Sequence, residues 1–259
     1  MKLWTPIENT ASAAPFYAEH GLSLYIETDS HKILFDMGQT GAFADNAETL
    51  GINLEQVDLA VLSHGHYDHS GGLQRFLELN STAPVFISPW AFEGHYNADG
   101  KNIGVDRSLL DSNRLVFAQN GQVIGNGLTL YDCRNCPIPV PIDPFGLSVM
   151  REGKLVSDDF RHEQYLLIQE GSRRILVSGC SHKGIRNLVR WFKPDVLIGG
   201  FHFMKLEDRR ALSEAADDLM QYPTTYYTGH CTGEIQFEYL KDKMGDRLIR
   251  ISAGMALTV

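Results

Sequence analysis

The sequence predicts an α/β protein built as a layered sandwich with mixed sheets. Its first and last thirds alternate short apolar segments typical of strands with segments of helical periodicity, which indicates helical crossovers between strands. The middle third contains paired β-rich segments, which indicate hairpins. Sheets that combine hairpins with helical crossovers are typical of layered sandwiches rather than of purely parallel sheets. Because no linker, low-complexity tract or internal repeat is present, we expect a single domain over residues 1–259.

The elements of the first third are separated by turn residues. Gly51 closes a helical pattern, and Gly71 and Gly72 precede another. The segment 57–64 contains the continuous apolar run 59–62, as expected of a strand buried on both faces. We expect strands at 22–28, 32–38, 57–64 and 84–88 and helices at 39–50 and 73–79.

The middle third is expected to be β-rich and the last third to alternate again. Segments 114–119, 122–132 and 165–179 read as hairpins. The stretch 136–146 contains four prolines and is expected to be an extended surface loop. In the last third we expect helices at 185–192, 206–221 and 235–243 and strands at 195–200, 224–229 and 247–254.

The amino-acid composition of the chain limits the kinds of molecule that it is expected to bind. The chain has 23 basic and 32 acidic residues, a formal net charge of −9, which argues against a nucleic-acid-coating surface and against binding to anionic membranes. Its first residues lack the unbroken apolar stretch of a signal peptide, and no run approaches the ~20 apolar residues that span a bilayer. The four cysteines are too few and too scattered for a disulfide framework. We therefore expect a cytoplasmic protein that acts on a small molecule.

The densest signal is the segment Ser63-His64-Gly65-His66-Tyr67-Asp68-His69, which follows the apolar strand. A catalytic zinc is bound by about three protein ligands and keeps one position for water. His64 and His66 are two residues apart and share a face of an extended backbone, while Asp68 and His69 lie beyond and can serve a second ion. A solvated polar loop is the alternative, which this density of imidazole disfavours.

Three further histidines have one context in common. His182, His202 and His230 each follow an apolar strand and a glycine, as His64 follows its strand. The carboxyl ends of strands are where sites assemble in α/β sheets, so we expect these rings to converge. The remaining histidines lack this context: His20, His31 and His95 are expected at the surface or in packing, and the role of His162 is open.

Several segments of the chain resemble motifs of the metallo-β-lactamase superfamily. HGHYDHSGG (64–72) is similar to the H-x-H-x-D-H signature, and FDMG (35–38) to the superfamily's first motif. GCSHKGIRNLV (179–189), GGFHF (199–203) and GHCTG (229–233) resemble a branch labelled dihydropterin-ribofuranosylaminobenzene-phosphate synthase-like. These motifs extend from about residue 20 to residue 235. The resemblance implies a four-layer αββα sandwich with two mixed sheets.

The resemblance also implies a dinuclear centre of two divalent ions, zinc with manganese or iron as alternatives. Asp36 would support the ligand-bearing loop from behind. The ligands implied are His64 and His66 for the first ion, Asp68 and His69 for the second, and His182 and His230 as distal ligands that complete one site each.

Two departures from the superfamily pattern leave alternatives open. Cys180 occupies the position of the usual bridging aspartate, where it is either a soft ligand or a small packed residue. His162 lies 18 residues before Cys180 and competes with His182 for the third ligand position of the first ion.

The resulting functional prediction is a hydrolase that attacks an ester-like substrate with metal-activated hydroxide, a phosphoester or cyclic phosphodiester being favoured. Asp68 is expected to orient the nucleophile. His202 is expected to donate a hydrogen bond to the substrate or to serve as an outer metal ligand. Lys183 and Arg186, with the amides of 179–184, are candidates for phosphate binding, or else a capped helix start with solvated basic residues. The alternatives are a di-iron redox enzyme on the same fold and a non-catalytic ligand sensor.

Overall fold

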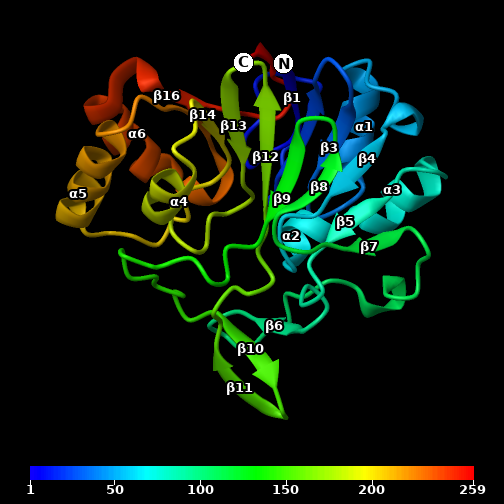
Figure 1. Ribbon diagram of the computed structural model, residues 1–259, viewed down its shortest axis with the longest axis horizontal. Helices are drawn as coiled ribbons and strands as arrows, with labels where there is room; N and C mark the ends of the chain where they lie inside the picture. The colour runs from blue at the N-terminus through cyan, green and yellow to red at the C-terminus, as the bar shows by residue number, and fades with distance from the viewer.

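The computed structural model describes residues 1–259 and consists of two seven-stranded sheets that pack face to face, with helices on both outer faces (Figure 1). The strand orders are β17-β1-β2-β3-β4-β5-β7 and β16-β15-β14-β13-β12-β9-β8. Each sheet combines antiparallel and parallel pairs. The predicted αββα sandwich with two mixed sheets is therefore confirmed.

The first sheet is built by both ends of the chain. Its helical layer is formed by α1 (Ala42–Thr49) and α3 (Leu73–Leu79), and the one-turn helix α2 (Tyr67–Ser70) follows β4. A short 3-10 turn at Leu54–Gln56 precedes β4. The strands are β1 (Lys2–Ile7), β2 (Ser23–Glu27), β3 (Lys32–Phe35), β4 (Leu59–Val61), β5 (Val85–Ile87), β7 (Leu115–Phe117) and β17 (Ala256–Thr258).

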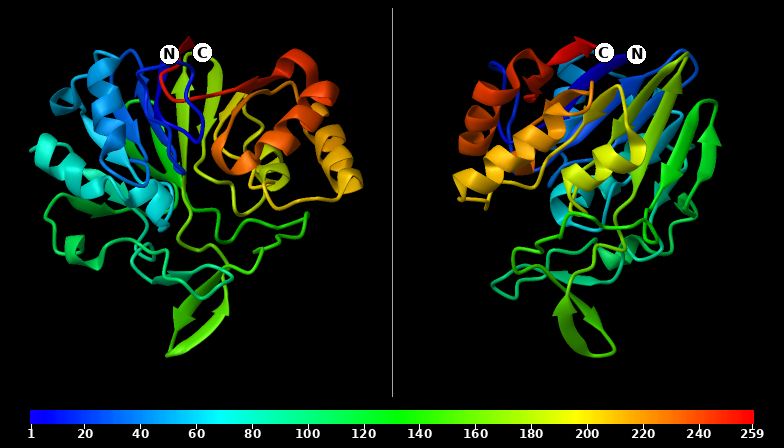
Figure 2. Two further views of the ribbon diagram at one scale, coloured as in Figure 1. Left: turned by 180° about the vertical axis from the view of Figure 1, so that it is seen from behind. Right: turned by 60° about the vertical axis from the view of Figure 1, so that its left-hand side comes forward.

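The second sheet is covered by three helices on its outer face (Figures 1 and 2). These are α4 (Ile185–Phe192), α5 (Arg209–Met220) and α6 (Glu234–Met244). The strands are β8 (Gln122–Gly125), β9 (Leu128–Tyr131), β12 (Tyr165–Glu170), β13 (Arg173–Val177), β14 (Val196–Ile198), β15 (Thr225–Thr228) and β16 (Leu248–Arg250). None of the helices combines the length and apolar character needed to cross a membrane.

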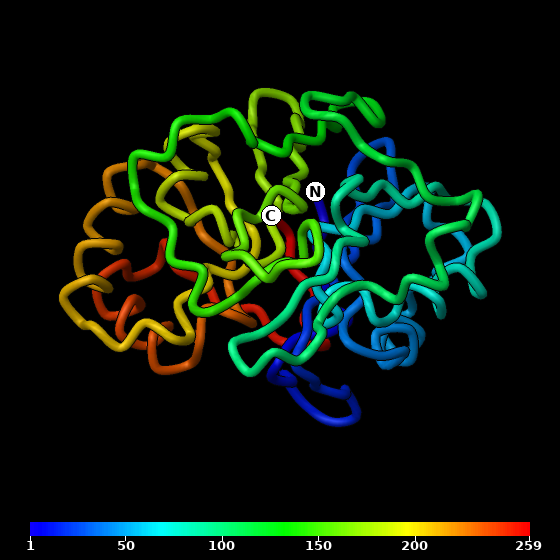
Figure 3. Tube along the Cα trace, turned by 90° about the horizontal axis from the view of Figure 1, so that it is seen from below, coloured from blue at the N-terminus to red at the C-terminus, as the bar shows by residue number.

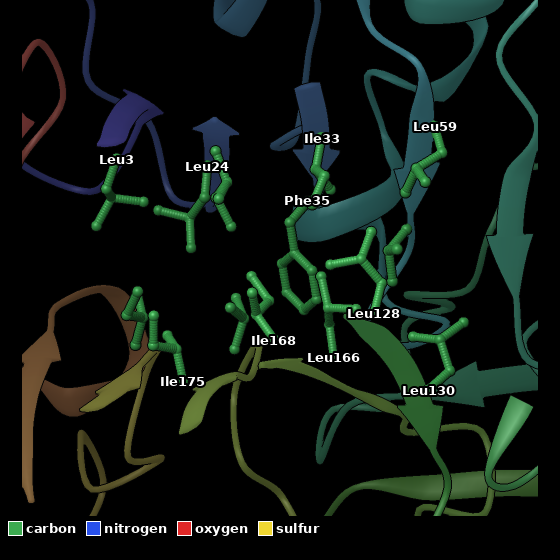
Figure 4. Close-up of a cluster of buried hydrophobic side chains, with 14 of the residues drawn as sticks. Leu3, Leu24, Ile33, Phe35, Leu59, Leu128, Leu130, Leu166, Ile168 and Ile175 are labelled. Carbon is green, nitrogen blue, oxygen red and sulfur yellow. The ribbon is translucent and has the colours of Figure 1, made fainter. Parts of the chain in front are cut away.

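Strand β4 shows why the apolar run at 59–62 has no alternation. Leu59 and Val61 belong to the core between the two sheets, where they lie with Phe35 opposite Leu128 and Leu166 of the second sheet (Figure 4). Ala60 and Leu62 point the other way, into the core beneath α1 and α3. Because both faces of the strand are buried, every position is apolar.

A small third sheet was not predicted from the sequence. It contains β6 (Gly94–Tyr96), β10 (Ser148–Arg151) and β11 (Lys154–Ser157), and its β10–β11 hairpin projects below the sandwich (Figures 1 and 2). The view from below shows the middle third of the chain extending across both halves of the molecule (Figure 3). The hairpin prediction was wrong for 114–119: β7 pairs in parallel with β5 in the first sheet instead of with β8.

Candidate metal centre

The loop after β4 brings the first two imidazoles to the edge of the sandwich. His64 and His66 flank Gly65, and Asp68 and His69 follow on α2. A side chain at Gly65 would lie 2.3 Å from the carbonyl oxygen of Ala91, so only glycine allows this loop its course.

The first group of ligands comes from both sheets. One ligand atom from each of His64, His66 and His182 lies within 4.8 Å of the others, and all three rings are buried. His64 Nε2 and His182 Nε2 are 3.3 Å apart. Nitrogens about 2.0–2.1 Å from a tetrahedral zinc are about 3.3 Å from each other, so this spacing fits two ligands of one ion.

The second group surrounds His69. Its Nε2 lies 3.1 Å from Nε2 of His230 and 3.2 Å from Sγ of Cys180. Asp68 Oδ2 lies 3.3 Å from Nε2 of His230 and 3.8 Å from Nε2 of His69. The structure therefore brings together all six predicted ligands in two adjacent groups, with Cys180 beside the second.

Hydrogen bonds accepted by Asp36 and Ser63 fix the proton positions of two rings. Asp36 Oδ2 accepts the Nδ1–H of His69 at 2.7 Å and the hydroxyl of Ser63 at 2.7 Å. Ser63 Oγ in turn accepts the Nδ1–H of His64 at 2.8 Å. Both imidazoles carry their proton on Nδ1, which leaves the Nε2 lone pair for a metal ion. Asp36 thus supports the loop from behind, as the resemblance implied.

His230 is oriented in the same way by residues near the N-terminus. Its Nδ1–H is donated to Oδ1 of Asn9 at 2.8 Å, and its backbone N–H is donated to the carboxylate of Glu8. Asn9 and Glu8 were not identified from the sequence. They are more than 200 residues from His230, and no local pattern links them.

The hydrogen bonds of His162 and His182 distinguish the two candidates for the third ligand position of the first ion. The backbone N–H of Gly65 donates to Nδ1 of His162 at 2.9 Å. Burial lowers the pKa of His162 to about 4, so the ring is neutral and carries its proton on Nε2. His182 instead lies in the first group, and its backbone N–H is donated to Glu163 at 2.7 Å. This geometry favours His182 as the ligand.

Two nitrogens of the first group have no hydrogen-bond partner. His66 Nε2 and His182 Nδ1 are both buried and unpaired. Burial is the largest cause that lowers the pKa of both rings well below the usual range, which keeps them neutral and able to ligate. An unpaired buried nitrogen costs about 1–3 kcal/mol, and a bound ion removes that cost from any such nitrogen that it contacts. The donor set fits a divalent cation.

His202 is close to the centre and Lys183 is not available to a ligand. The His202 ring lies 4.2 Å from the His182 ring, and burial lowers its pKa to about 4. The buried Lys183 amine donates to the backbone carbonyls of Asp132 at 2.7 Å and Glu163 at 3.1 Å. The prediction that Lys183 binds substrate is not supported, because its amine is hydrogen-bonded inside the protein.

The other parts of the predicted phosphate site, Arg186 and the turn at 179–184, also have structural roles within the protein. Arg186 Nε donates to the carboxylate of Asp218 at 2.7 Å, and both side chains are largely buried. The motif at 179–184 forms the turn before α4. Gly179, at the start of this turn, lies so close to Ser63 that a side chain on it would be 2.2 Å from Ser63 Oγ. The turn therefore serves to bring His182 to the centre.

Two histidines expected at the surface or in packing lie at or beside the ligands. His20 is half-exposed, and its Nε2 lies 3.3 Å from Oδ2 of Asp68. His95 is completely buried and faces Asp158 and His162. Neither follows a strand and a glycine, so the pattern that identified the other rings could not find them.

Stability of the metal-free chain is expected to fall with acidification. Burial lowers the pKa of both His162 and His230 from about 6.5 to about 4. Between these values the unfolded chain binds protons that the folded chain does not, so stability decreases as pH falls below about 6.5. Each ring contributes about 1–2 kcal/mol of loss by pH 5, partly offset by His69, whose pKa is raised beside Asp36 despite burial. Urea unfolding of the chelator-treated chain at pH 7 and pH 5 measures this; equal stability at both would contradict it.

Comparison with known proteins agrees with this geometry. Residues 17–230 match the family model described as the metallo-beta-lactamase superfamily. The chain is 29% identical to a Methanocaldococcus jannaschii protein named 7,8-dihydropterin-6-methyl-4-(beta-D-ribofuranosyl)-aminobenzene-5'-phosphate synthase, over 98% of this chain and 95% of that protein. It is 31% identical to an uncharacterised protein of the same organism over 88% of this chain and 89% of that protein.

Solved structures show the same architecture. The crystal structure of Tm1679, described as a metal-dependent hydrolase of the beta-lactamase superfamily, matches with a TM-score of 0.87 and 27% identity and covers 100% of this chain and 99% of that chain. Zinc-bound PqqB of Methylobacterium extorquens shares the fold, with a TM-score of 0.61 and 12% identity over the full length of both chains. With the family model matched over most of the chain, this protein belongs to the metallo-beta-lactamase superfamily and is a metal-dependent hydrolase.

Proposed function

We propose that the chain hydrolyses a phosphoester or cyclic phosphodiester of a small metabolite at a dinuclear centre, with zinc as the favoured metal. The observation that carries the dinuclear centre is the orientation of His64, His69 and His230. Each donates its Nδ1–H to a fixed acceptor and presents Nε2 to a neighbouring ligand. His64, His66 and His182 would hold one ion, and Asp68, His69 and His230 the other. Bound there, the ions would lower the pKa of water towards about 7 and polarise the bond to be cleaved.

Asp68 has the position and charge of the group that orients the attacking water and receives its proton. Burial alone would raise its pKa, but His69 and the hydrogen bonds of His20 and His230 hold the pKa well below the usual range. Its side chain is therefore a carboxylate at neutral pH. Of these neighbours His20 is half-exposed, so it can pass a proton between Asp68 and solvent.

Cys180 is placed to serve the second ion as a soft ligand. Its thiol is buried, and this burial raises its pKa, so it stays protonated without an ion. Metal coordination deprotonates a thiol. Its Sγ, 3.2 Å from His69 Nε2, therefore supports a ligand set that suits zinc better than manganese.

The substrate class is proposed from two observations. The M. jannaschii relative is named for a 5'-phosphate compound. A cavity of about 1060 Å³ reaches His230 and Asn9, and its lining includes the acidic residues Glu207, Glu234 and Asp242. Lys183 and Arg186 are engaged within the protein, and the acidic side chains that line this cavity outnumber its two arginines, Arg209 and Arg250. Most of the positive charge that a phosphate requires would therefore come from the ions of the centre. His202 would then contact the substrate beside the first ion.

A panel assay tests this proposal. We expect the zinc-loaded chain to hydrolyse bis(p-nitrophenyl) phosphate or a cyclic nucleotide phosphodiester, and we expect chelation to abolish the activity. A thioester and a lactone serve as matched alternatives in the same assay. Turnover of either of these without phosphoester turnover would overturn the substrate class, and no turnover of any substrate by the loaded chain would favour a ligand sensor.

A further inference from the structure

A second group of buried polar side chains lies between the metal centre and the small sheet. His95 is on β6, Asp158 follows β11, and His162 precedes β12. Together with His66 they bring one ligand-type atom each to within 4.8 Å of one another, and all four are buried. Neither of the two groups described above includes His95 or Asp158.

Asp158 is the negative centre of this cluster. Its Oδ2 lies 3.0 Å from Nδ1 of His95 and 3.3 Å from Nε2 of His162. Its Oδ1 accepts the backbone N–H of Phe160 at 2.7 Å. No lysine or arginine forms an ion pair with Asp158, so imidazoles alone face a buried carboxylate, an arrangement that costs several kcal/mol unless the charge is compensated.

The cluster also contains unsatisfied nitrogens. The Nε2 atoms of His66, His95 and His162 are buried and form no hydrogen bond, although His162 Nε2 lies 3.3 Å from Oδ2 of Asp158. Buried polar atoms in folded proteins are nearly always paired, and an unpaired group points to a strained site or to a bound water or ion. A bound cation would compensate the charge of Asp158 and use the free nitrogen of His66.

We propose that His66, His95 and Asp158 bind a third divalent cation beside the dinuclear centre. His162 is a positioning residue in this site: its Nδ1 accepts the N–H of Gly65, so its Nε2–H faces Asp158. Two imidazoles and one carboxylate suit zinc, cobalt, nickel or manganese. His66 would join this site through Nε2 and the His64–His182 group through Nδ1, as an imidazolate that has released its ring N–H proton to solvent. The cation would connect the small sheet to the loop that carries the other ligands.

Metal stoichiometry tests the third site. The full chain is treated with chelator, titrated with Zn²⁺, desalted and measured by elemental analysis. We expect three zinc ions per wild-type chain and two in both Asp158→Asn and His95→Gln. Asp158→Asn keeps the size of the side chain and removes its charge, and His95→Gln keeps a polar group, so agreement between them excludes a folding defect peculiar to one variant. His31→Gln, on the turn before β3, is the matched histidine control and should bind three.

The third site would be overturned if the wild-type chain saturates at two ions and both variants also bind two, or if the variants still bind three. These outcomes are independent of the proposed hydrolase function, which fails only on turnover and on the ligands of the dinuclear centre. If the wild type binds a single ion and Asp158→Asn binds none, the third site stands and the dinuclear centre falls.

Discussion

His69→Ala is expected to bind at least one metal ion fewer than the wild type and to lose hydrolase activity by more than about 100-fold. His69 Nε2 faces both His230 and Cys180, so its removal takes the central ligand out of the second group. Loss of residues that only support metal ligands typically costs about 10–100-fold in affinity or activity, and loss of a ligand should exceed that. Elemental analysis and the phosphodiester assay measure the two effects.

His31→Ala is the control for this substitution. His31 is a half-buried histidine that belongs to neither group of candidate ligands. Its Nε2 accepts the backbone N–H of Asn126. It should keep its metal and its activity. If His69→Ala retained wild-type metal content and turnover, the second group would not be a metal site.

Asp36→Ala is expected to destabilise the chain by about 3–9 kcal/mol and to weaken metal binding at both groups together. The substitution leaves three buried donors without an acceptor, namely the N–H and hydroxyl of Ser63 and the Nδ1–H of His69. Each unsatisfied donor costs about 1–3 kcal/mol. Asp36 also has a φ of 59°, a left-handed conformation that aspartate tolerates better than alanine does.

Asp36→Asn removes the charge of the side chain but keeps its size, so it measures the contribution of the charge alone. Asparagine also tolerates the left-handed conformation and keeps one carbonyl oxygen, so its loss of stability should be smaller than that of alanine. Metal affinity should still fall, because the amide accepts the imidazole N–H less strongly than a carboxylate does. Urea unfolding and zinc titration of both variants provide the measurements. Wild-type stability in Asp36→Ala would contradict the role assigned to this network.

The sequence predicted the ligands because their signal is local. Four of them lie within six residues after a buried strand, and His182 and His230 have the same strand–glycine context. Where strands run parallel, this context places their following residues at one edge. The structure has the ring of His182 beside that of His64 and the ring of His230 beside that of His69. The sandwich could be predicted for the same reason, since alternation and hairpin turns are local patterns.

What could not be predicted depends on contacts between distant parts of the chain. The pairing of β7 with β5 is set by the crossover between them and not by the sequence of β7. Lys183 has the local pattern of an anion site, yet its amine is directed to the carbonyl of Asp132, 51 residues away. His95 has no pattern of its own, and only the fold of the small sheet brings it to Asp158.

The most direct test of the dinuclear centre is the position of anomalous scattering in a crystal of the zinc-loaded chain, measured at the zinc absorption edge. We predict one peak about 2.0–2.1 Å from Nε2 of His64 and a second at the same distance from Nε2 of His69 and His230. Zinc peaks bound elsewhere on the chain, with none at these nitrogens, would contradict the account.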